Sequence, residues 1–132
     1  MRVAKQDIPV RIDVPGAVAR QLPDFGDTRG GVGSIGAEYF SMAAGTDLAP
    51  LLEGLEHDLC QSVHWGYVMD GDLTVTYTDG STERCRTGDV FYWPEGHTVR
   101  VDEDAELILF SPQVEHGTVI EHIANKVAAV AT

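Results

Sequence analysis

Positive charge is scarce in this chain. Nine Lys and Arg residues stand against 21 Asp and Glu, which gives a formal net charge of −12 and a sequence pI near 4.5. Such a surface repels phosphate backbones and anionic lipid headgroups, so we expect neither a nucleic-acid nor a membrane partner. The sequence also lacks an apolar run of the ~18 residues that a membrane span needs. Because its N-terminus, MRVAKQDIPV, has no apolar stretch like that of a signal peptide, we expect a cytoplasmic protein.

Cysteine is equally rare, and the two present are Cys60 and Cys85. Two cysteines do not make a disulfide framework, and in a reducing compartment both are expected to be thiols. Cys85 falls where the strand pattern requires an apolar core residue, so we expect a structural role for it. Cys60 has histidines nearby in the sequence and is a candidate metal ligand, with an inert buried thiol as the alternative.

What the chain has in abundance is turn residues, with 14 glycines and six prolines spread along 132 residues. The length predicts one domain over residues 1–132. Alternating apolar and polar residues predict two N-terminal strands within residues 1–35, at 8–14 and 17–22, and a series of strands from residue 61 to 112. We expect these later strands to be separated by turns at Asp70-Gly71, Asp79-Gly80, Glu95-Gly96 and the acidic stretch 102–104.

Two helices are expected to flank the strands. Leucines at positions 48, 51, 52 and 55 follow a helical period after Thr46, a suitable N-cap, and this predicts a helix of two or three turns. A second helix is predicted over the tail, residues 118–131. The tail histidines His116 and His122 are expected to face solvent.

Two short motifs resemble those of the cupin family. The sequence YVMDGDL at residues 67–73 resembles the end of the first cupin motif, and GDVFYWPEG at 88–96 resembles the second. The resemblance covers about residues 36–112. It implies an all-β, cupin-type double-stranded β-helix, which is a jelly-roll barrel, with short flanking helices. It also implies a divalent metal inside the barrel, as many cupins have, and cupins are often dimers.

The metal-ligand positions depart from the family pattern. In the cupin pattern they fall on Asp58 and Cys60 (or His57 and Leu59), then on His64, and finally near His97. The resemblance therefore implies a metal held by Cys60, His64 and His97, with Asp58 or His57 as a fourth ligand. Thiolate with imidazole favours zinc, and iron, manganese and nickel are the alternatives. Without metal, His64 and His97 would hydrogen-bond to each other or to an organic ligand.

These positions also suggest a ligand pocket and three possible functions. We expect the pocket to be lined by His57, Gly66, Val68, Tyr92 and Val99. The first hypothesis is a metal-dependent enzyme that acts on a small polar organic molecule, with His64 as the catalytic residue. The others are a metal-free binding or sensing module, and a metal-independent isomerase or cyclase with His64 as base. A nucleophilic Cys60 is a further possibility.

If His64 and Tyr92 face inward, Trp65 and Trp93 face outward. Large aromatic residues on an outer sheet face are typical of subunit interfaces, so we expect a homodimer. Cover by the N-terminal strands or the tail helix is the alternative.

Overall fold

The N-terminal part of the chain forms a three-stranded antiparallel ribbon. The computed structural model describes residues 1–31 and 33–131, and only the backbone of residues 130 and 131. A single turn of 3-10 helix, η1 (Lys5–Asp7), precedes β1 (Val10–Val14), β2 (Ala17–Leu22) and β3 (Ile35–Met42). The two predicted N-terminal strands are confirmed. β2 pairs with β3 along its whole length, so the ribbon joins the main sheet through β3.

Two long strands, β4 (His64–Tyr77) and β7 (His97–Pro112), form the frame of the barrel. The predicted turns at Asp70-Gly71 and at residues 102–104 are wrong, because each strand runs through its turn sequence without a break. The two strands pair with each other, and their register shifts between Val68 and Leu73, which bends both strands at the same level. Gly71 is required at this bend, since a Cβ there would lie 2.6 Å from the backbone of Ala105.

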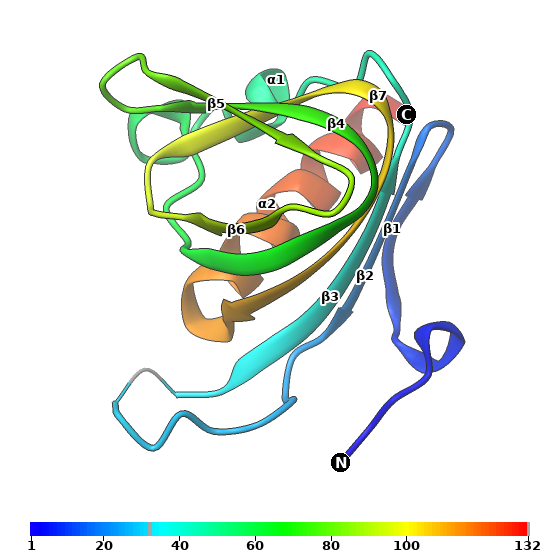
Figure 1. Ribbon diagram of the computed structural model, residues 1–132, viewed down its shortest axis with the longest axis vertical. Coiled ribbons are helices and arrows are strands. Elements are labelled where there is room, and N and C mark those ends of the chain that lie inside the picture. The colour runs from blue at the N-terminus through cyan, green and yellow to red at the C-terminus, as the bar shows by residue number, and fades with distance from the viewer. Residues whose placement is uncertain (32, 132) are drawn as a thin grey trace.

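Two short strands complete the barrel. β5 (Thr82–Arg86) follows the predicted Asp79-Gly80 turn, and β6 (Val90–Trp93) ends at Pro94 as the sequence predicts. The strand order is β1-β2-β3-β7-β4-β5, with β6 paired to β4. Figure 1 shows β4 and β7 curving around the barrel while β1, β2 and β3 run side by side along one edge. This is the all-β jelly-roll barrel with flanking helices that the sequence predicts.

The helices differ from the prediction in length. α1 (Ala49–Leu52) is a single turn instead of two or three, and Gly54, at φ 99°, follows its last turn. A second turn of 3-10 helix, η2 (Glu56–Asp58), comes next. α2 (Gln113–Ala131) begins five residues before the predicted start at 118 and so includes His116. None of the described helices is long and apolar enough to cross a membrane.

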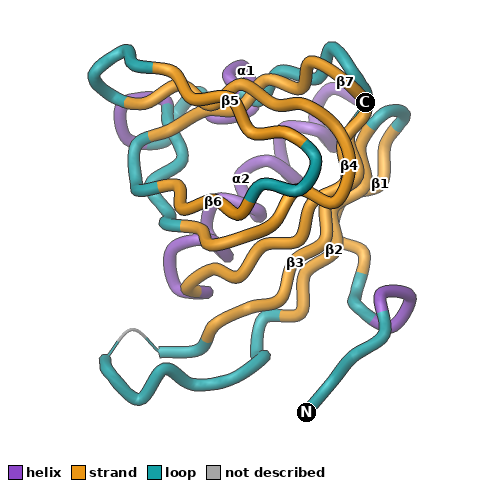
Figure 2. Tube along the Cα trace, in the orientation of Figure 1, coloured by secondary structure: helices purple, strands orange, loops and turns teal. Residues whose placement is uncertain are grey.

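α2 covers the open side of the barrel. It contacts α1, β1 and β7, and Figure 2 shows it running behind the strands β4 and β6. One apolar core fills the barrel around Val68, Leu73 and Leu107. A second core, which includes Ile12, Leu52 and Ile123, lies between α2, α1 and the N-terminal strands. Residues at the junction of these two cores form the candidate site.

Candidate functional site

Backbone hydrogen bonds hold Cys60 and His97 side by side. The Cys60 N–H donates to the His97 carbonyl at 2.9 Å, and the Gly96 N–H donates to the Cys60 carbonyl at 2.7 Å. Both side chains are buried. The loop before β4 and the start of β7 are therefore fixed relative to each other where a thiol and an imidazole meet.

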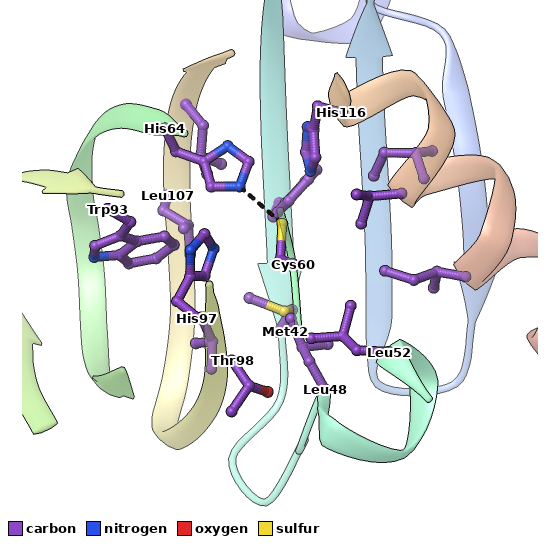
Figure 3. Close-up of a pocket in the computed structure, with 16 residues that line it drawn as sticks. Met42, Leu48, Leu52, Cys60, His64, Trp93, His97, Thr98, Leu107 and His116 are labelled. Atoms are coloured by element: carbon purple, nitrogen blue, oxygen red, sulfur yellow. Dashed lines mark hydrogen bonds between the residues drawn. The ribbon is translucent and has the colours of Figure 1, made fainter. Parts of the chain in front are cut away.

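His64 joins this pair from the first position of β4. Strand pairing places it opposite Trp93, and its side chain points into the barrel, 2% exposed. Its Nε2 lies 3.5 Å from the Cys60 Sγ. One ligand atom from each of Cys60, His64 and His97 lies within 4.8 Å of the other two. We call these three residues the open cluster. Figure 3 shows them facing a common space, with a dashed line joining Cys60 and His64.

Hydrogen bonds on the far side of each ring decide which nitrogen faces this space. The His97 Nδ1 lies 2.7 Å from the Pro94 carbonyl, which can only accept, so Nδ1 carries the proton and Nε2 is left as a lone pair. The His64 Nδ1 lies 2.6 Å from the Ser111 hydroxyl. That hydroxyl donates to the Glu38 carboxylate at 2.5 Å, so it accepts from His64 Nδ1–H. Both rings thus offer Nε2 to the open cluster.

A second group of polar side chains lies behind His64, and we call it the closed network: Gln21, Glu38, Ser111 and His116. All four are buried. The Glu38 carboxylate accepts from Ser111, from His116 Nδ1 and, at 3.3 Å, from Gln21. Gln21 in turn accepts from Arg11 at 2.6 Å. Each carboxylate oxygen therefore already has a donor. Although Glu38, His64 and His116 are close enough to hold a metal, both oxygens of Glu38 and the Nδ1 atoms of both histidines already form hydrogen bonds.

Burial keeps the open cluster uncharged in the metal-free protein. It lowers the pKa of His64 well below the usual range, and the nearby His116 and His97 add to this effect. It lowers the pKa of His97 to about 4, although the hydrogen bond to Pro94 opposes the shift. It raises the pKa of the Cys60 thiol to about 12. At neutral pH the cluster therefore holds a thiol and two neutral imidazoles.

The open cluster faces a small cavity of about 40 Å³. This exceeds the roughly 10–15 Å³ that one water needs. Val99 and Trp93 line it from the barrel, and Val119, Ile120 and Ile123 line it from α2. Thr98 also lines the cavity, and its Oγ1 is buried without a hydrogen-bond partner among the residues that the structure describes. The space suits a metal ion with a small ligand inside an apolar shell.

His57 and Asp58 do not reach the cluster. The prediction that one of them is a fourth metal ligand is therefore wrong. The His57 side chain is 70% exposed. Asp58 is exposed as well, and its carboxylate accepts from the Gly54 N–H at 3.0 Å. Both residues have left-handed backbone angles in η2, which turns their side chains toward solvent.

Three further residues that were predicted to line the pocket do not line the cavity, namely Tyr92, Gly66 and Val68. Tyr92 is 50% exposed on the outer face, whereas Trp93 is 2% exposed and points inward, which reverses the predicted orientation of β6. Gly66 leaves space for the Phe91 ring rather than for a ligand, since a Cβ there would lie 2.3 Å from that ring. Val68 is fully buried in the barrel core. Of the predicted pocket residues, Val99 lines the cavity.

Sequence reasoning missed Glu38, Ser111 and His116. His116 was expected to face solvent, yet it is 3% exposed and bonded to Glu38. The signals were present but weak. His116 precedes Val119, Ile120 and Ile123 at the spacing of one helical face, and Glu38 is a carboxylate between Ala37 and Tyr39 in a largely apolar strand. The structural expectation for Cys85 is confirmed, because it is 3% exposed in the barrel core.

Comparison with solved structures supports the fold. No family model matches the chain, and no curated protein matches it. The polyketide cyclase RemF from Streptomyces resistomycificus aligns with a TM-score of 0.55 and 20% identity over 85% of this chain and 78% of its own. An ectoine synthase from P. lautus aligns with a TM-score of 0.52 and 18% identity over 76% of this chain and 67% of its own.

A third similar structure is the oxalate decarboxylase of Bacillus subtilis, described with Mn(II) centers. It aligns with a TM-score of 0.57 and 19% identity over 81% of this chain, which spans only 28% of the decarboxylase chain. At these identities the likeness shows the fold alone, and the fold is a cupin-type barrel. The function must therefore be argued from the site.

Proposed function

We propose that this protein binds one divalent metal ion, zinc foremost, through Cys60, His64 and His97, and that it takes a small organic ligand at a fourth coordination position. The observation that supports this proposal is the convergence of two Nε2 lone pairs and a thiol beside a cavity. Each imidazole has its Nδ1–H held by an acceptor, as histidine ligands of metals usually do.

The donor set favours zinc over the alternatives. One thiolate with two imidazoles suits zinc, whereas iron and manganese prefer oxygen-rich or all-imidazole sets, and nickel remains an alternative. Three protein ligands leave a position open, which is typical of catalytic rather than structural zinc. A cytoplasmic location, which we also propose, would keep Cys60 reduced and available.

The protein's own residues would serve a metal-assisted reaction in distinct ways. Ser111 and Glu38 fix the tautomer and the direction of the His64 ring. Trp93 and the α2 residues Val119 and Ile120 exclude water from the reacting groups. A bound zinc ion would polarise a carbonyl or lower the pKa of a coordinated water. On this proposal the protein is a metal-dependent enzyme for a small organic substrate.

One observation favours a second candidate, a metal-independent isomerase or cyclase. The hydrogen bonds from Cys60 through His64 and Ser111 to Glu38 form a continuous chain without any metal. A base oriented by a further hydrogen-bonded group is the arrangement that general-base catalysis requires. In this alternative His64 would take a proton from the ligand, and Cys60 would be its neutral partner.

Elemental analysis of the purified, untagged protein separates the two candidates. We expect about one zinc per chain, lost in the Cys60→Ala/His64→Ala double variant. The matched control is Cys85→Ala/His57→Ala, which removes the same two residue types outside the cluster and should keep its metal. Failure of the wild-type protein to bind zinc, iron, manganese or nickel even after reconstitution would reject the metal proposal and favour the second candidate.

We also propose that the protein is a homodimer whose copies meet at the outer face of β4 and β6. Trp65, Tyr67 and Met69 on β4 and Val90 and Tyr92 on β6 are between 41% and 82% exposed. The rings of Trp65 and Tyr92 lie 5.5 Å apart. Because each copy carries a charge of −12, two copies would approach most readily through such an uncharged aromatic face.

Sedimentation tests the dimer. Trp65→Glu should convert a dimer to a monomer, because it places a charge within this aromatic face. The control Val114→Glu changes a residue that is 74% exposed on α2, outside this face, and should leave the dimer intact. A monomeric wild-type protein at micromolar concentration would contradict the proposal.

A further inference from the structure

A second cavity lies next to the one that holds the open cluster. It has a volume of about 70 Å³, and all its lining residues are apolar except Thr46. The two cavities share five lining residues, namely Phe40, Met42, Leu48, Ile120 and Ile123. Beyond this shared wall the second cavity extends between Ile12 of β1 and Val127 of α2. The open cluster and the apolar space under the N-terminal ribbon are therefore separated by this one layer of apolar side chains.

The nature of this space constrains what can fill it. Apolar cavities of this kind are not hydrated favourably and instead accept apolar molecules. A ligand bound at the open cluster and longer than a water molecule would meet the shared wall, whose side chains are apolar. Met42 and Leu48 in this wall have flexible side chains that can adjust to an occupant. The second cavity thus suits the apolar end of a ligand.

The polar end of the ligand is constrained by charge. A divalent ion held by one thiolate and two neutral imidazoles retains a single net positive charge in a buried site. A monoanionic group in the remaining position would neutralise it, which low-dielectric surroundings strongly favour. Thr98 adds a hydroxyl whose Oγ1 is buried and without a hydrogen-bond partner among the described residues. Figure 3 shows Thr98 between His97 and Leu48, in the direction of the shared wall.

We infer that the ligand is an amphipathic monocarboxylate, with its carboxylate at the metal and Thr98 and its aliphatic or aromatic body in the second cavity. This inference rests on the proposed metal site. It replaces the expectation of a small polar ligand, because apart from the cluster, Thr98, His116 and Thr46 the residues that line the two cavities are apolar.

Calorimetric titration of the zinc-loaded protein with acetate, butanoate and hexanoate tests the inference. Each added methylene that enters the second cavity should tighten binding by about fourfold. Hexan-1-ol, which has the same chain without the charge, should bind at least tenfold more weakly than hexanoate. Equal affinities across the three carboxylates, or equal affinities for hexanol and hexanoate, would overturn the inference.

Variants of α2 test whether the hydrocarbon chain of the ligand lies in the second cavity. Val127→Phe fills the second cavity and should remove most of the gain from acetate to hexanoate. Val127→Leu is a milder replacement that should remove part of it, should the larger ring impair folding. Ala128→Phe places the same ring at the neighbouring exposed position and should keep the gain. If both Val127 variants kept the full gain in affinity from acetate to hexanoate, the hydrocarbon chain of the ligand would lie outside the second cavity, and the inference would be overturned.

Zinc content measured in the same samples separates the two possible failures. One zinc per protein molecule, with affinities that do not rise from acetate to hexanoate, would reject this inference and leave the proposed metal function standing. Absence of zinc, iron, manganese and nickel from reconstituted wild-type protein would reject both, because the anionic group would have no partner. Loss of hexanoate binding in Cys60→Ala, together with zinc, would support both.

Discussion

The open cluster and the closed network both contain buried histidine and share a border at His64, yet they differ in how their polar atoms are paired. In the closed network each Glu38 oxygen accepts a hydrogen bond from a buried neighbour. In the open cluster His64 and His97 keep their Nδ1 atoms occupied and leave Nε2 facing a cavity. On our proposal, this unused ligand capacity, rather than the presence of histidine alone, distinguishes the metal site from its surroundings.

The largest expected effect is a loss of folding stability when a residue of the closed network is replaced. Glu38→Leu removes a fully buried carboxylate and leaves His116 and Ser111 without their acceptor. We expect it to lower the free energy of unfolding by about 3–5 kcal/mol. Cys60→Ala in the open cluster should cost only about 1 kcal/mol.

Urea denaturation of the metal-free proteins measures both values. Tyr39→Leu is not a suitable control, because Tyr39 bonds to Met69. Glu121→Leu is better, since Glu121 is exposed on α2 and forms no side-chain hydrogen bond or ion pair with the residues that the structure describes, so the change should cost little. If Cys60→Ala destabilised the fold as much as Glu38→Leu, the distinction between the two regions would be wrong.

Sequence predicted the barrel better than the site, because the barrel depends on local signals. Pro94, Gly80 and Gly96 fix strand ends and turns within a few residues. The bend at Gly71 was misread as a turn, because a bulged continuous strand and a hairpin use the same Asp-Gly sequence. Only pairing with β7 distinguishes the two possibilities.

The closed network could not be predicted, because its contacts join distant parts of the chain. His64 and Ser111 are 47 positions apart, and Glu38 and His116 are 78 apart. The prediction of which face of β6 points inward is wrong for a related reason. Gly66 accommodates the Phe91 ring from the neighbouring strand, which turns Trp93 inward, and no pattern within residues 90–93 reveals this.

A pH titration of stability is expected to show the next largest effect. Burial lowers the pKa of His97 from an ordinary 6.5 to about 4. Between pH 4 and 6.5 His97 is therefore protonated in the unfolded chain but neutral in the folded protein. Stability is therefore complete above pH 6.5 and falls as the pH drops toward 4, by about 3 kcal/mol for this residue. The lowered pKa of His64 extends the loss further in the same direction.

His97→Gln should flatten this part of the profile in the metal-free protein, as measured by urea denaturation at several pH values. His57→Gln is the matched control, because the His57 side chain is 70% exposed, and its profile should match that of the wild type. An unchanged slope between pH 6.5 and 4 in His97→Gln would show that the imidazole of the open cluster is not held neutral by burial.

The smallest effect concerns the residue that links the two regions. Ser111 accepts from His64 Nδ1 and donates to Glu38, so it transmits the orientation set by the closed network to a ligand of the open cluster. Ser111→Ala leaves all three proposed metal ligands in place but frees the His64 tautomer, and we expect it to weaken zinc binding by about 10- to 100-fold. Ser111→Thr, which keeps the hydroxyl, should restore most of the affinity.

Competition titration with a chromogenic chelator measures the zinc affinity, and cobalt spectra report whether the thiolate and imidazoles still bind. Ser62→Ala is the control, because Ser62 is as fully buried as Ser111 and lies two residues from Cys60, and the hydroxyl that this change removes donates to the Val63 carbonyl. Equal losses in Ser62→Ala and Ser111→Ala would reflect general destabilisation. A loss confined to Ser111→Ala would mean that the closed network, although it holds no ligand itself, sets the affinity of the open cluster by fixing which nitrogen of His64 faces the metal.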